Sequence, residues 1–345
     1  MPKTPDLRSR SEHRPRRGTI GWLAFGLAAI ACLMGAGLAD AAAPPELYER
    51  AVSASLEILT DDQLDGSGFV IDPAGIAVTA AHAVPDTRRR IEVRSPVWGR
   101  RPVTILARDV GHDIALLKLP ERAEPYPALT LATAPAPVGG DVYLLGAPLF
   151  RHAVLLRAMV ARRTPTFEYL PDQQYYLRIV HLSGPSPVGT SGGPWMNADG
   201  RVVGLQSGLM HDGGVAVGIA YMAPAAAIAR LLETRRDATT PTLRIGFEEL
   251  WEQSDSFRRR FPPQLEALVA GRVTPGGPAA RAGLRPRDVI THIGERRVRL
   301  RDEIIAAIRA MRPGDPVDLR ILRPGEAPRV VRIATARLET EVARP

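Results

Sequence analysis

The sequence predicts a mainly β protein with two folded domains, an all-β first domain followed by a smaller α+β domain. Between residues 44 and 237, short runs of β-forming residues alternate with turns rich in glycine, proline and aspartate. No long helical stretches separate these runs, which argues against a doubly wound α/β fold and favours a β-sandwich or a pair of barrels. After residue 242 the pattern changes to strands mixed with helical stretches.

Length and composition are those of a globular protein. A chain of 345 residues is long enough for two domains with separate cores, and 45% apolar and 24% charged residues are ordinary values. The single cysteine, Cys32, excludes an intramolecular disulfide and a cysteine metal site.

The net charge of +8 raises the question of nucleic-acid binding. The positive charge is almost entirely arginine, since Lys3 and Lys118 are the only lysines, and no basic stripe with interleaved aromatic residues is present. We therefore expect no nucleic-acid partner. A DNA-associated protein is kept as the last of three hypotheses. It would require DNA binding that weakens as the salt concentration rises.

Residues 1–43 are predicted to be a signal peptide or an N-terminal membrane anchor. Residues 1–18 are polar and basic, and residues 19–39 carry no charge. The Ala-Asp-Ala sequence at 39–41 suits a signal peptidase. The apolar run is long for a cleaved signal and long enough to span a bilayer once, so both alternatives stay open. Either one implies export of the remainder.

The predicted first domain covers residues 44–237 and is followed by a linker at 238–242. It is expected to begin with a short helix and to end with another. The expected helices are 48–55 and 224–233, and the expected strands are 68–72, 76–80, 90–94, 103–108, 114–119, 142–145, 155–161, 175–180, 202–207 and 215–221.

The predicted second domain covers residues 243–338. Its expected strands and helix are those of a compact α+β module. The strands are 243–247, 268–273, 290–293, 317–322 and 329–334, a charged helical stretch follows the first strand, and a helix is expected near 302–311.

Ser191 lies among three glycines in residues 188–194, just ahead of a strand-like run at 201–205. Glycine leaves backbone N–H groups uncovered, so such a loop can present a hydroxyl and aim backbone donors at the group which that hydroxyl attacks. Taken by itself, this stretch fits an ordinary Gly/Ser hairpin turn equally well.

A nucleophilic serine needs a base, and His82 is the strongest candidate. It ends an apolar strand, and the two alanines before it leave room for the imidazole to enter a cleft. His112 directly precedes an aspartate on an expected strand, so the two side chains should point in opposite directions. His152, His181 and His211 have no comparable setting and are expected to be surface or locally hydrogen-bonded residues.

The base needs a carboxylate that orients it, and Asp113 is the candidate. It opens the apolar run 113–117, where an unpaired buried carboxylate would be costly. A purely structural ion pair for Asp113 stays open. Asp109, four residues earlier, is interpreted as a turn residue.

The motifs at 79–82, 113–116 and 189–194, in this order, resemble those of the trypsin-like serine proteases. The stretch 66–72 and the C-terminal module narrow the resemblance to the HtrA (DegP/DegS-like) family, which joins a double β-barrel protease domain to one or two PDZ domains. The resemblance covers about residues 45–337 and implies a trypsin-like double β-barrel protease domain followed by one α+β PDZ domain.

The resemblance also implies roles for the site residues. Ser191 would be the nucleophile, His82 the general base and then acid, and Asp113 the orienting carboxylate. The N–H groups of Gly189 and Ser191 would form the oxyanion hole. No cofactor and no metal are implied.

The sequence departs from the family near the nucleophile. Thr190 stands where these enzymes often carry asparagine, and residues 183–187 are unlike the usual loop, which leaves open whether the oxyanion hole is preformed. No acidic residue lies between Gln173 and Thr190 or within residues 204–211. A basic P1 residue would meet no countercharge there, so we predict small or medium apolar P1 residues.

Residues 244–247 resemble a PDZ carboxylate-binding loop. The expected peptide-binding residues are Ile245, Gly246 and Phe247, whose backbone N–H groups would bind a peptide C-terminus while the peptide adds a strand. Ile304 and Ile308 share a helical face, which fits either groove lining or core packing. Residues 276–284 and 287–290 match the family's PDZ core more specifically.

The leading hypothesis is therefore an exported serine endopeptidase of protein quality control or regulated proteolysis. The expected partners are unfolded or misfolded proteins and, at the PDZ domain, peptide C-termini. We expect the periplasm, with the protein soluble after signal cleavage or anchored in the inner membrane by residues 19–39. We also expect a homotrimer with residues 47–52 in its interface. The alternative is a catalytically weak chaperone or PDZ scaffold on a protease fold.

Overall fold

The structure, a computed structural model, describes residues 45–84, 89–171 and 173–339. The expected signal peptide or anchor lies outside these residues. Within the described ranges, no helix has the length and apolar character needed to cross a membrane.

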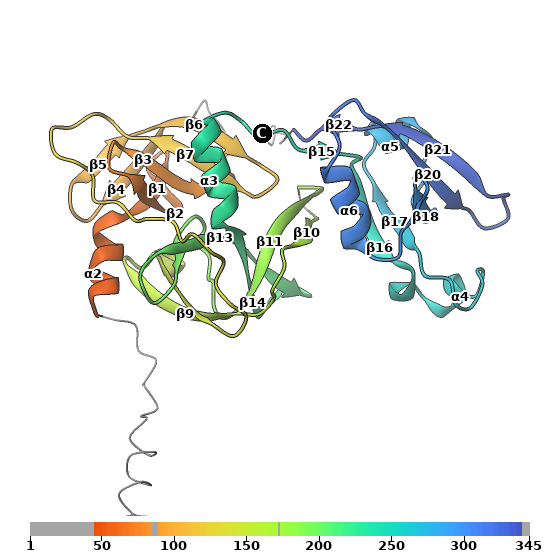
Figure 1. The fold of residues 1–345 in the computed structure, drawn as a ribbon, viewed down its shortest axis with the longest axis horizontal. Coiled ribbons are helices and arrows are strands. Elements are labelled where there is room, and N and C mark those ends of the chain that lie inside the picture. Colours follow the sequence, from red (N-terminus) through yellow and green to blue (C-terminus); the bar gives the residue numbers. More distant parts are fainter. Residues whose placement is uncertain (1–44, 85–88, 172, 340–345) are drawn as a thin grey trace, which may run out of the picture. The chain divides into compact units, whose positions relative to one another are not determined.

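The first part of the described chain consists of two antiparallel seven-stranded sheets (Figure 1). The first has the strand order β5-β4-β1-β2-β3-β7-β6, and the second has the order β10-β11-β14-β13-β12-β8-β9. An additional pairing of β11 with β9 curls the second sheet back on itself. This arrangement confirms the all-β first domain.

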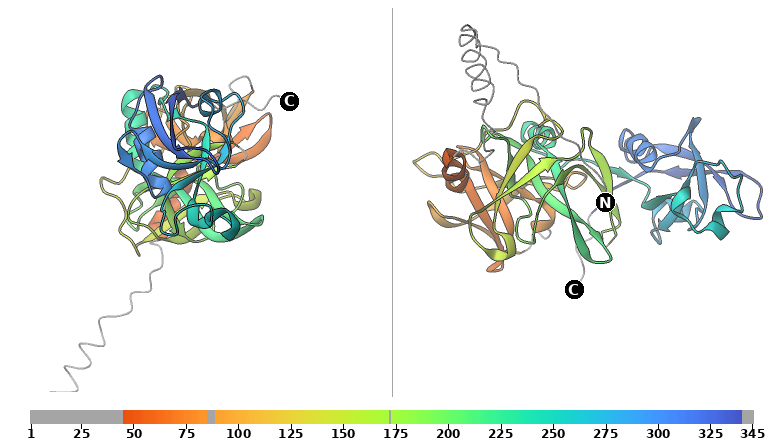
Figure 2. Two further views of the ribbon diagram at one scale, coloured as in Figure 1. Left: turned by 90° about the vertical axis from the view of Figure 1, so that its right-hand side faces the viewer. Right: turned by 90° about the horizontal axis from the view of Figure 1, so that it is seen from below.

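The helices of this part are α2 (Pro45–Ala54) and α3 (Ala225–Thr234). Figure 2 shows the two sheets from two further directions. The strands of the first sheet are β1 (Ser55–Thr60), β2 (Gln63–Asp72), β3 (Ile76–Ala80), β4 (Ile91–Ser95), β5 (Gly99–Pro102), β6 (Thr104–Asp109) and β7 (Ile114–Lys118). Those of the second sheet are β8 (Asp141–Gly146), β9 (Val154–Val160), β10 (Thr166–Leu170), β11 (Tyr175–Ser183), β12 (Pro194–Met196), β13 (Val202–Asp212) and β14 (Val215–Pro224).

Four strands of the two seven-stranded sheets were not expected from the sequence, and each has a local reason. β5 is exposed at every position, so it carries no apolar pattern, and β12 is only three residues long. β1 directly follows helix α2 without a turn, and the hairpin strand β10 pairs only with β11.

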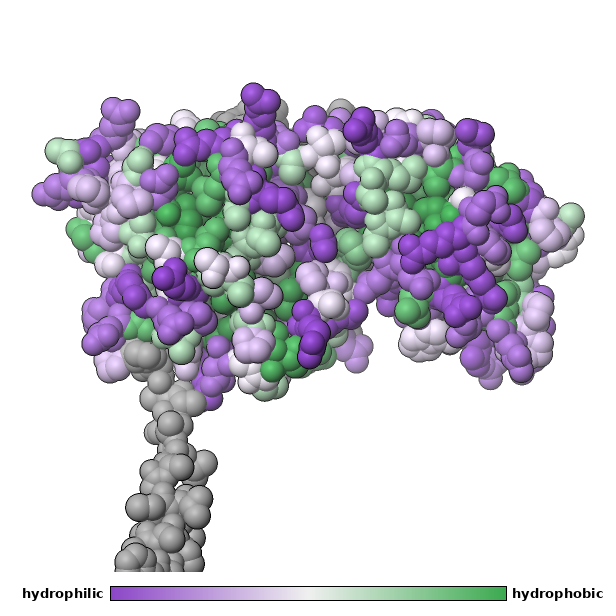
Figure 3. Space-filling view, viewed as in Figure 1, coloured by the Kyte–Doolittle hydropathy of each residue, from purple (hydrophilic) through white to green (hydrophobic). Residues whose placement is uncertain are grey.

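The two sheets share a core, and the candidate site lies where they meet. Phe69 and Val78 from the first sheet and Leu145 and Leu205 from the second belong to one buried cluster. Burial of such apolar surface is the main stabilising term for a fold of this kind. Polar side chains cover much of the outer face seen in Figure 3, with apolar areas between them.

The apolar side chains of helix α2 pack against the core of the same chain. Leu47 and Ala51 are fully buried in the shared core. The side chains of the expected trimer segment that remain available to another chain are therefore the more exposed ones, such as Tyr48 and Glu49.

The C-terminal part has its own sheet, with the order β16-β17-β18-β20-β21 and β19 paired to β18. Ile304 and Ile308 are buried in its core, and Ile308 also lines a small cavity beside Ile245 and Phe247. Its elements are β15 (Pro241–Thr242), β16 (Ile245–Glu249), the 3₁₀ turn η3 (Leu250–Glu252), α4 (Asp255–Arg258), β17 (Leu268–Val273), α5 (Pro278–Arg281), β18 (Val289–Ile293), β19 (Arg296–Arg297), α6 (Arg301–Arg309), β20 (Pro316–Leu322), β21 (Arg329–Ala334) and β22 (Ala336–Arg337).

Candidate active site

His82 and Asp113 are brought together by two neighbouring strands. β3 is buried at every position and pairs with β7, with Ala80 opposite Ile114. His82 lies in the 3₁₀ turn η1 (Ala81–Ala83) directly after β3, and Asp113 immediately precedes β7. The ends of the two strands therefore place both side chains at the same edge of the sheet.

The imidazole is fixed by this carboxylate. His82 Nδ1 lies 2.7 Å from Asp113 Oδ2, and the His82 backbone N–H donates to Asp113 Oδ1 at 3.0 Å. Ser207 Oγ donates a third hydrogen bond, of 2.5 Å, to Asp113 Oδ2. Asp113 is 2% exposed, and these three hydrogen-bond donors stabilise its buried carboxylate. This arrangement leaves Nε2 of His82 as the ring atom that can take up a proton.

The pKa of His82 is raised above its ordinary value. Burial on its own would lower this pKa, but the negative charge of Asp113 and its hydrogen bond outweigh the effect of burial. The site therefore stabilises the imidazolium that a general base forms when it accepts a proton.

Ser67 holds the loop that carries Ser191. The Ser67 N–H donates to the Ser191 carbonyl at 2.7 Å. The Ser67 hydroxyl donates to the Gly189 carbonyl at 2.8 Å and accepts the Ala147 N–H at 3.0 Å. One buried residue thus joins the nucleophile loop to both sheets.

The direction of the Gly189 N–H follows from a second contact. The Leu149 N–H donates to the Val188 carbonyl at 2.7 Å. In a trans peptide the C=O and the following N–H point in opposite directions, so the Gly189 N–H points away from Leu149. Within the described residues, neither this N–H nor that of Ser191 has a hydrogen-bond acceptor. Two uncovered donors beside a serine hydroxyl can stabilise a developing oxyanion.

Gly189 cannot readily be replaced at this position. Its φ is +94°, in the region that favours glycine, and an added Cβ would lie 2.2 Å from the Ala147 carbonyl oxygen. Thr190 closes the same turn, since its hydroxyl donates to the Pro187 carbonyl at 2.7 Å. The threonine side chain therefore takes part in the loop, which the sequence did not indicate.

Ser191 Oγ and the His82 imidazole are not hydrogen-bonded to each other in the described part of the chain. Such bonds are often long or poorly aligned in the absence of substrate and tighten in the complex. The histidine–carboxylate half of the arrangement is thus formed, and the serine–histidine half is not.

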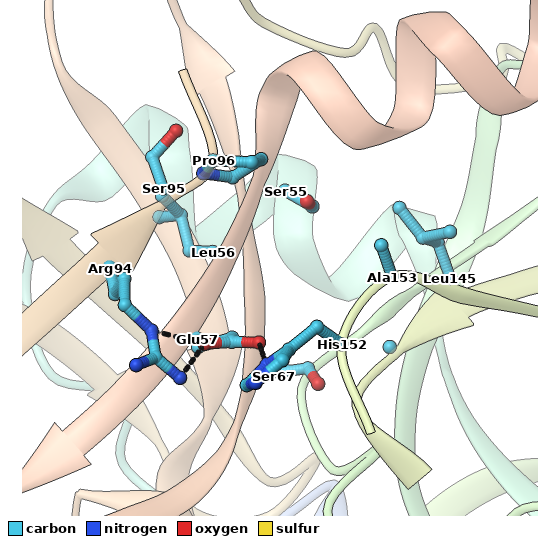
Figure 4. A pocket seen from close by; sticks show the side chains of 11 residues that line it. Ser55, Leu56, Glu57, Ser67, Arg94, Ser95, Pro96, Leu145, His152 and Ala153 are labelled. Carbon is cyan, nitrogen blue, oxygen red and sulfur yellow. Dashed lines mark hydrogen bonds and ion pairs between the residues drawn. The ribbon is translucent and has the colours of Figure 1, made fainter. Parts of the chain in front are cut away.

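A cavity of about 270 Å³ adjoins Ser67, and Figure 4 shows its lining side chains. Glu57 lies between Arg94, whose Nε donates at 2.6 Å, and His152, whose Nδ1 pairs with the other carboxylate oxygen. Because His152 precedes β9, this cluster links the first sheet to the segment that contains Leu149.

The segment 147–153 holds left-handed backbone at residues other than glycine. Leu149 has a φ of +47°, Phe150 of +61° and Ala153 of +50°. Such conformations cost free energy and are often found at functional sites. Here they place the Leu149 N–H against the nucleophile loop.

Two of the rival histidines have partners nearby in the chain. His112 Nδ1 lies 2.8 Å from Asp109 Oδ2, and His181 Nε2 lies 2.8 Å from Glu168 Oε1. Asp109 opens the turn before β7 as expected, since its carbonyl accepts the His112 N–H at 3.2 Å, and it is also buried at the end of β6 and pairs with His112. Burial opposes ionisation of Asp109, but the hydrogen bond and charge of His112 lower its pKa overall.

His112 also differs from expectation in its setting. It lies in the turn before β7, and Asp113 has a φ of +58°, so the strand alternation expected for these two residues does not apply. The side chains of His112 and Asp113 nevertheless have different partners.

The expected PDZ residues lie on β16. Ile245 and Phe247 are buried, and β16 pairs with β17. The Phe247 N–H donates to the Tyr176 hydroxyl at 2.6 Å. A peptide that adds a strand at this backbone group would have to displace the tyrosine.

The sequence did not identify Ser67 or Ser207 as parts of the site. Ser67 lies in the stretch 66–72 that supports the family resemblance, and Ser207 ends an expected strand. Their partners, Gly189 and Asp113, are more than ninety residues away in the chain, so these contacts cannot be predicted from a local sequence pattern.

Fold and site together define a trypsin-like peptidase fold followed by a PDZ domain. Residues 66–205 match the family described as the trypsin-like peptidase domain, and residues 243–333 match the PDZ domain family. The chain thus combines a trypsin-like peptidase domain with a PDZ domain, and its relatives and structural neighbours include proteins named as HTRA2 or HtrA-type proteases.

Two relatives illustrate the similarity. The chain is 29% identical over 266 residues to "Serine protease HTRA2, mitochondrial" of Bos taurus, a match that covers 71% of this chain and 55% of the relative. It is 31% identical over 268 residues to "Probable periplasmic serine endoprotease DegP-like" of Pseudomonas fulva, covering 75% and 53%. The chain thus spans about half the length of these curated relatives.

Solved structures support the fold. The structure of "HtrA-type protease AlgW with tripeptide" superposes with a TM-score of 0.61 at 20% identity, covering 85% of this chain and 96% of that one. The serine endoprotease from Yersinia pestis superposes with a TM-score of 0.57 at 19% identity, covering 85% and 97%. At these identities the likeness concerns the fold.

Proposed function

We propose that this protein is a serine endopeptidase that cleaves proteins with His82, Asp113 and Ser191. The main support is that the backbone N–H groups of Gly189 and Ser191 have no hydrogen-bond acceptor within the described residues. Both lie on the loop that Ser67 holds. The His82–Asp113 pair supplies an oriented base with a raised pKa.

The proposed reaction follows from these groups. His82 Nε2 accepts the Ser191 hydroxyl proton as Oγ attacks the substrate carbonyl carbon. The two N–H groups then stabilise the oxyanion, and His82 returns the proton to the leaving amine. Water, activated by the same imidazole, releases the acyl group from Ser191.

The cleanest test compares the full chain with Ser191→Ala on casein. The proposal predicts cleavage by the unsubstituted protein and none by the variant. Equal cleavage by both proteins, or none by either across conditions, would exclude this role for Ser191.

A second candidate function is a catalytically weak chaperone or PDZ scaffold. It is favoured by the missing hydrogen bond between Ser191 and His82 and by the engagement of the Phe247 N–H with Tyr176. Suppression of aggregation of an unfolded protein, equal in the unsubstituted chain and in Ser191→Ala and without cleavage, would support it.

The proposed partners are unfolded or misfolded proteins as substrates and peptide C-termini at Ile245, Gly246 and Phe247. We also propose a homotrimer and a periplasmic location. The location is supported by the DegP-like relatives, which are named periplasmic. Sedimentation of the purified protein tests the assembly, and N-terminal sequencing of the mature protein tests removal of residues 1–41.

A further inference from the structure

The proposed catalytic Asp113 occupies a strained backbone position. Its φ is +58°, in the left-handed region that residues other than glycine seldom adopt and that costs free energy. Its carbonyl accepts the Ala81 N–H at 3.1 Å, and its carboxylate binds His82. The backbone and the side chain of Asp113 therefore both depend on a conformation that other groups must hold.

The turn between β6 and β7 is short. It consists of residues 110–113, since Asp109 and Ile114 lie opposite each other in the two strands. Its tip is tied to the second sheet, because the Gly111 carbonyl accepts the Arg178 N–H of β11 at 2.9 Å. The last two residues of the turn, which include the proposed catalytic carboxylate, therefore lie between a fixed tip and the start of β7.

The backbone hydrogen bonds within this turn are long. The Asp109 carbonyl accepts the His112 N–H at 3.2 Å, and the Val110 carbonyl accepts the Asp113 N–H at 3.3 Å. Both distances lie at or beyond the upper end of the usual range for a backbone N–H donor. These two bonds alone would hold the left-handed residue weakly.

The side chains of Asp109 and His112 close the turn a second time. His112 Nδ1 lies 2.8 Å from Asp109 Oδ2, and the His112 N–H also donates to Asp109 Oδ1 at 3.2 Å. Asp109 is 7% exposed, so water competes little for this carboxylate. The carboxylate therefore binds both the backbone and the imidazole of the residue directly before Asp113.

The imidazole of His112 can act on the site only through this turn. Within the described residues its ring nitrogen Nδ1 pairs with Asp109, and its Nε2 is buried without a hydrogen-bond partner. Neither ring nitrogen is bonded to His82 or Ser191 in the part of the chain that the structure describes. His112 is thus placed to fix the Asp113 backbone and not to exchange a proton with a substrate.

We propose that Asp109 and His112 form a second histidine–carboxylate pair, which positions the carboxylate of Asp113 against His82. The inference rests on the proposed protease function. With the pair in place, Asp113 keeps Oδ1 on the His82 N–H and Oδ2 on Nδ1. Without the pair, the backbone of Asp113 can relax out of the left-handed region. This rotates its Cα–Cβ bond and carries the carboxylate away from the imidazole.

The first test is His112→Ala in the full chain, with steady-state kinetics on one internally quenched peptide. We expect kcat to fall about tenfold to a hundredfold, because a small displacement of a catalytic group is costly. KM should change little, since no contact with the substrate is removed. The acidic limb of kcat/KM should also move to lower pH, because a weaker contact with Asp113 raises the pKa of His82 less.

Two further variants separate positioning from a general loss of packing. His112→Gln provides an amide that can donate to Asp109, so it should recover most of kcat and return the acidic limb toward its original pH. The matched control is His181→Ala, which removes another half-buried pair of the same kind. His181 lies 2.8 Å from Glu168, and its side chain is 16% exposed, against 14% for His112. This control should keep kcat and the acidic limb unchanged.

Asp109→Asn covers the case that His112→Ala fails to fold. It keeps the shape of the side chain, but one of the two His112 donors loses its oxygen acceptor. It should therefore change kcat and the acidic limb in the same direction as His112→Ala, by a smaller amount. Urea unfolding of each variant measures the accompanying loss of stability.

Three results would overturn the inference while cleavage that depends on Ser191 leaves the protease function intact. The first is an unchanged kcat and acidic limb in folded His112→Ala or Asp109→Asn, and the second is the same changes in His181→Ala. The third is a failure of His112→Gln to recover kcat. Absence of Ser191-dependent cleavage by the unsubstituted protein would overturn the protease function and the inference together.

Discussion

The backbone N–H of Leu149 donates a 2.7 Å hydrogen bond to the carbonyl of Val188. Because this bond fixes the Val188–Gly189 peptide plane, it turns the Gly189 N–H away from Leu149. The proposed oxyanion hole therefore depends on residues 147–153 as well as on the nucleophile loop.

Gly189→Ala should lower kcat strongly. The added methyl group would lie 2.2 Å from the Ala147 carbonyl oxygen at a φ of +94°, so the peptide must move and its N–H must turn. Loss of one oxyanion donor costs roughly 10²–10³ in kcat. Steady-state kinetics on a quenched peptide measure it. The control is Gly213→Ala, at a φ of +54° with no atom near the added Cβ. Equal losses in both variants would argue against the donor role.

The pH dependence of kcat/KM should report His82. The base must be neutral, and its pKa is raised by Asp113, so activity should fall as the pH drops through a value above the ordinary histidine pKa of about 6.5. In Asp113→Asn the negative charge that raises the His82 pKa is absent, so the acidic limb should move to lower pH. The rate should also fall by about 10⁴. An acidic limb at the same pH in both proteins would assign it to another group.

Ser67→Ala should weaken both stability and activity. The substitution leaves the buried Ala147 N–H without its acceptor and frees the Gly189 carbonyl. An unsatisfied buried donor costs about 1–3 kcal/mol in the free energy of unfolding. Urea unfolding and peptide kinetics measure the two effects. Ser53→Ala is the control, because its hydroxyl makes only a local, exposed hydrogen bond to the Arg50 carbonyl. A loss no greater than in the control would show that Ser67 does not hold the loop.

Leu149→Gly should stabilise the protein while keeping its activity. Leu149 has a φ of +47° and is 58% exposed, so glycine relieves the left-handed strain and little apolar burial is lost. The left-handed conformation costs roughly 1–2 kcal/mol for a residue other than glycine. The N–H that holds Val188 is unchanged. Thermal unfolding compares this variant with Leu149→Ala, which keeps the strain. A lower melting temperature for glycine than for alanine would contradict the assignment of strain.

Much of the fold could be predicted from the sequence because most of its strands are runs of apolar and β-forming residues bounded by turn residues. The buried run of β3 and the apolar run of β7 were found with nearly their observed bounds, and His82 and Asp113 at their ends followed from them. The exposed strand β5 and the three-residue β12 carry no such pattern and were missed.

The supports of the candidate site could not be predicted in the same way. Ser67, Ser207 and Gln206 bind partners that are distant in the chain. In the sequence, nothing distinguishes these three residues from other polar residues on strands. Residues 183–187 were recognised as unusual, but only the structure shows Ser186 bonded to Gln206. The state of the Gly189 N–H depends on a bond from Leu149, forty residues earlier in the chain.

The most direct test of the proposed site is reaction of the full chain with a fluorophosphonate, followed by mass spectrometry of the digested protein. With an oriented base and both donors in place, Ser191 should form a single covalent adduct without any added peptide, and His82→Ala should abolish it. An adduct on another residue, or no adduct on Ser191 in a preparation that still cleaves casein, would contradict the proposed site.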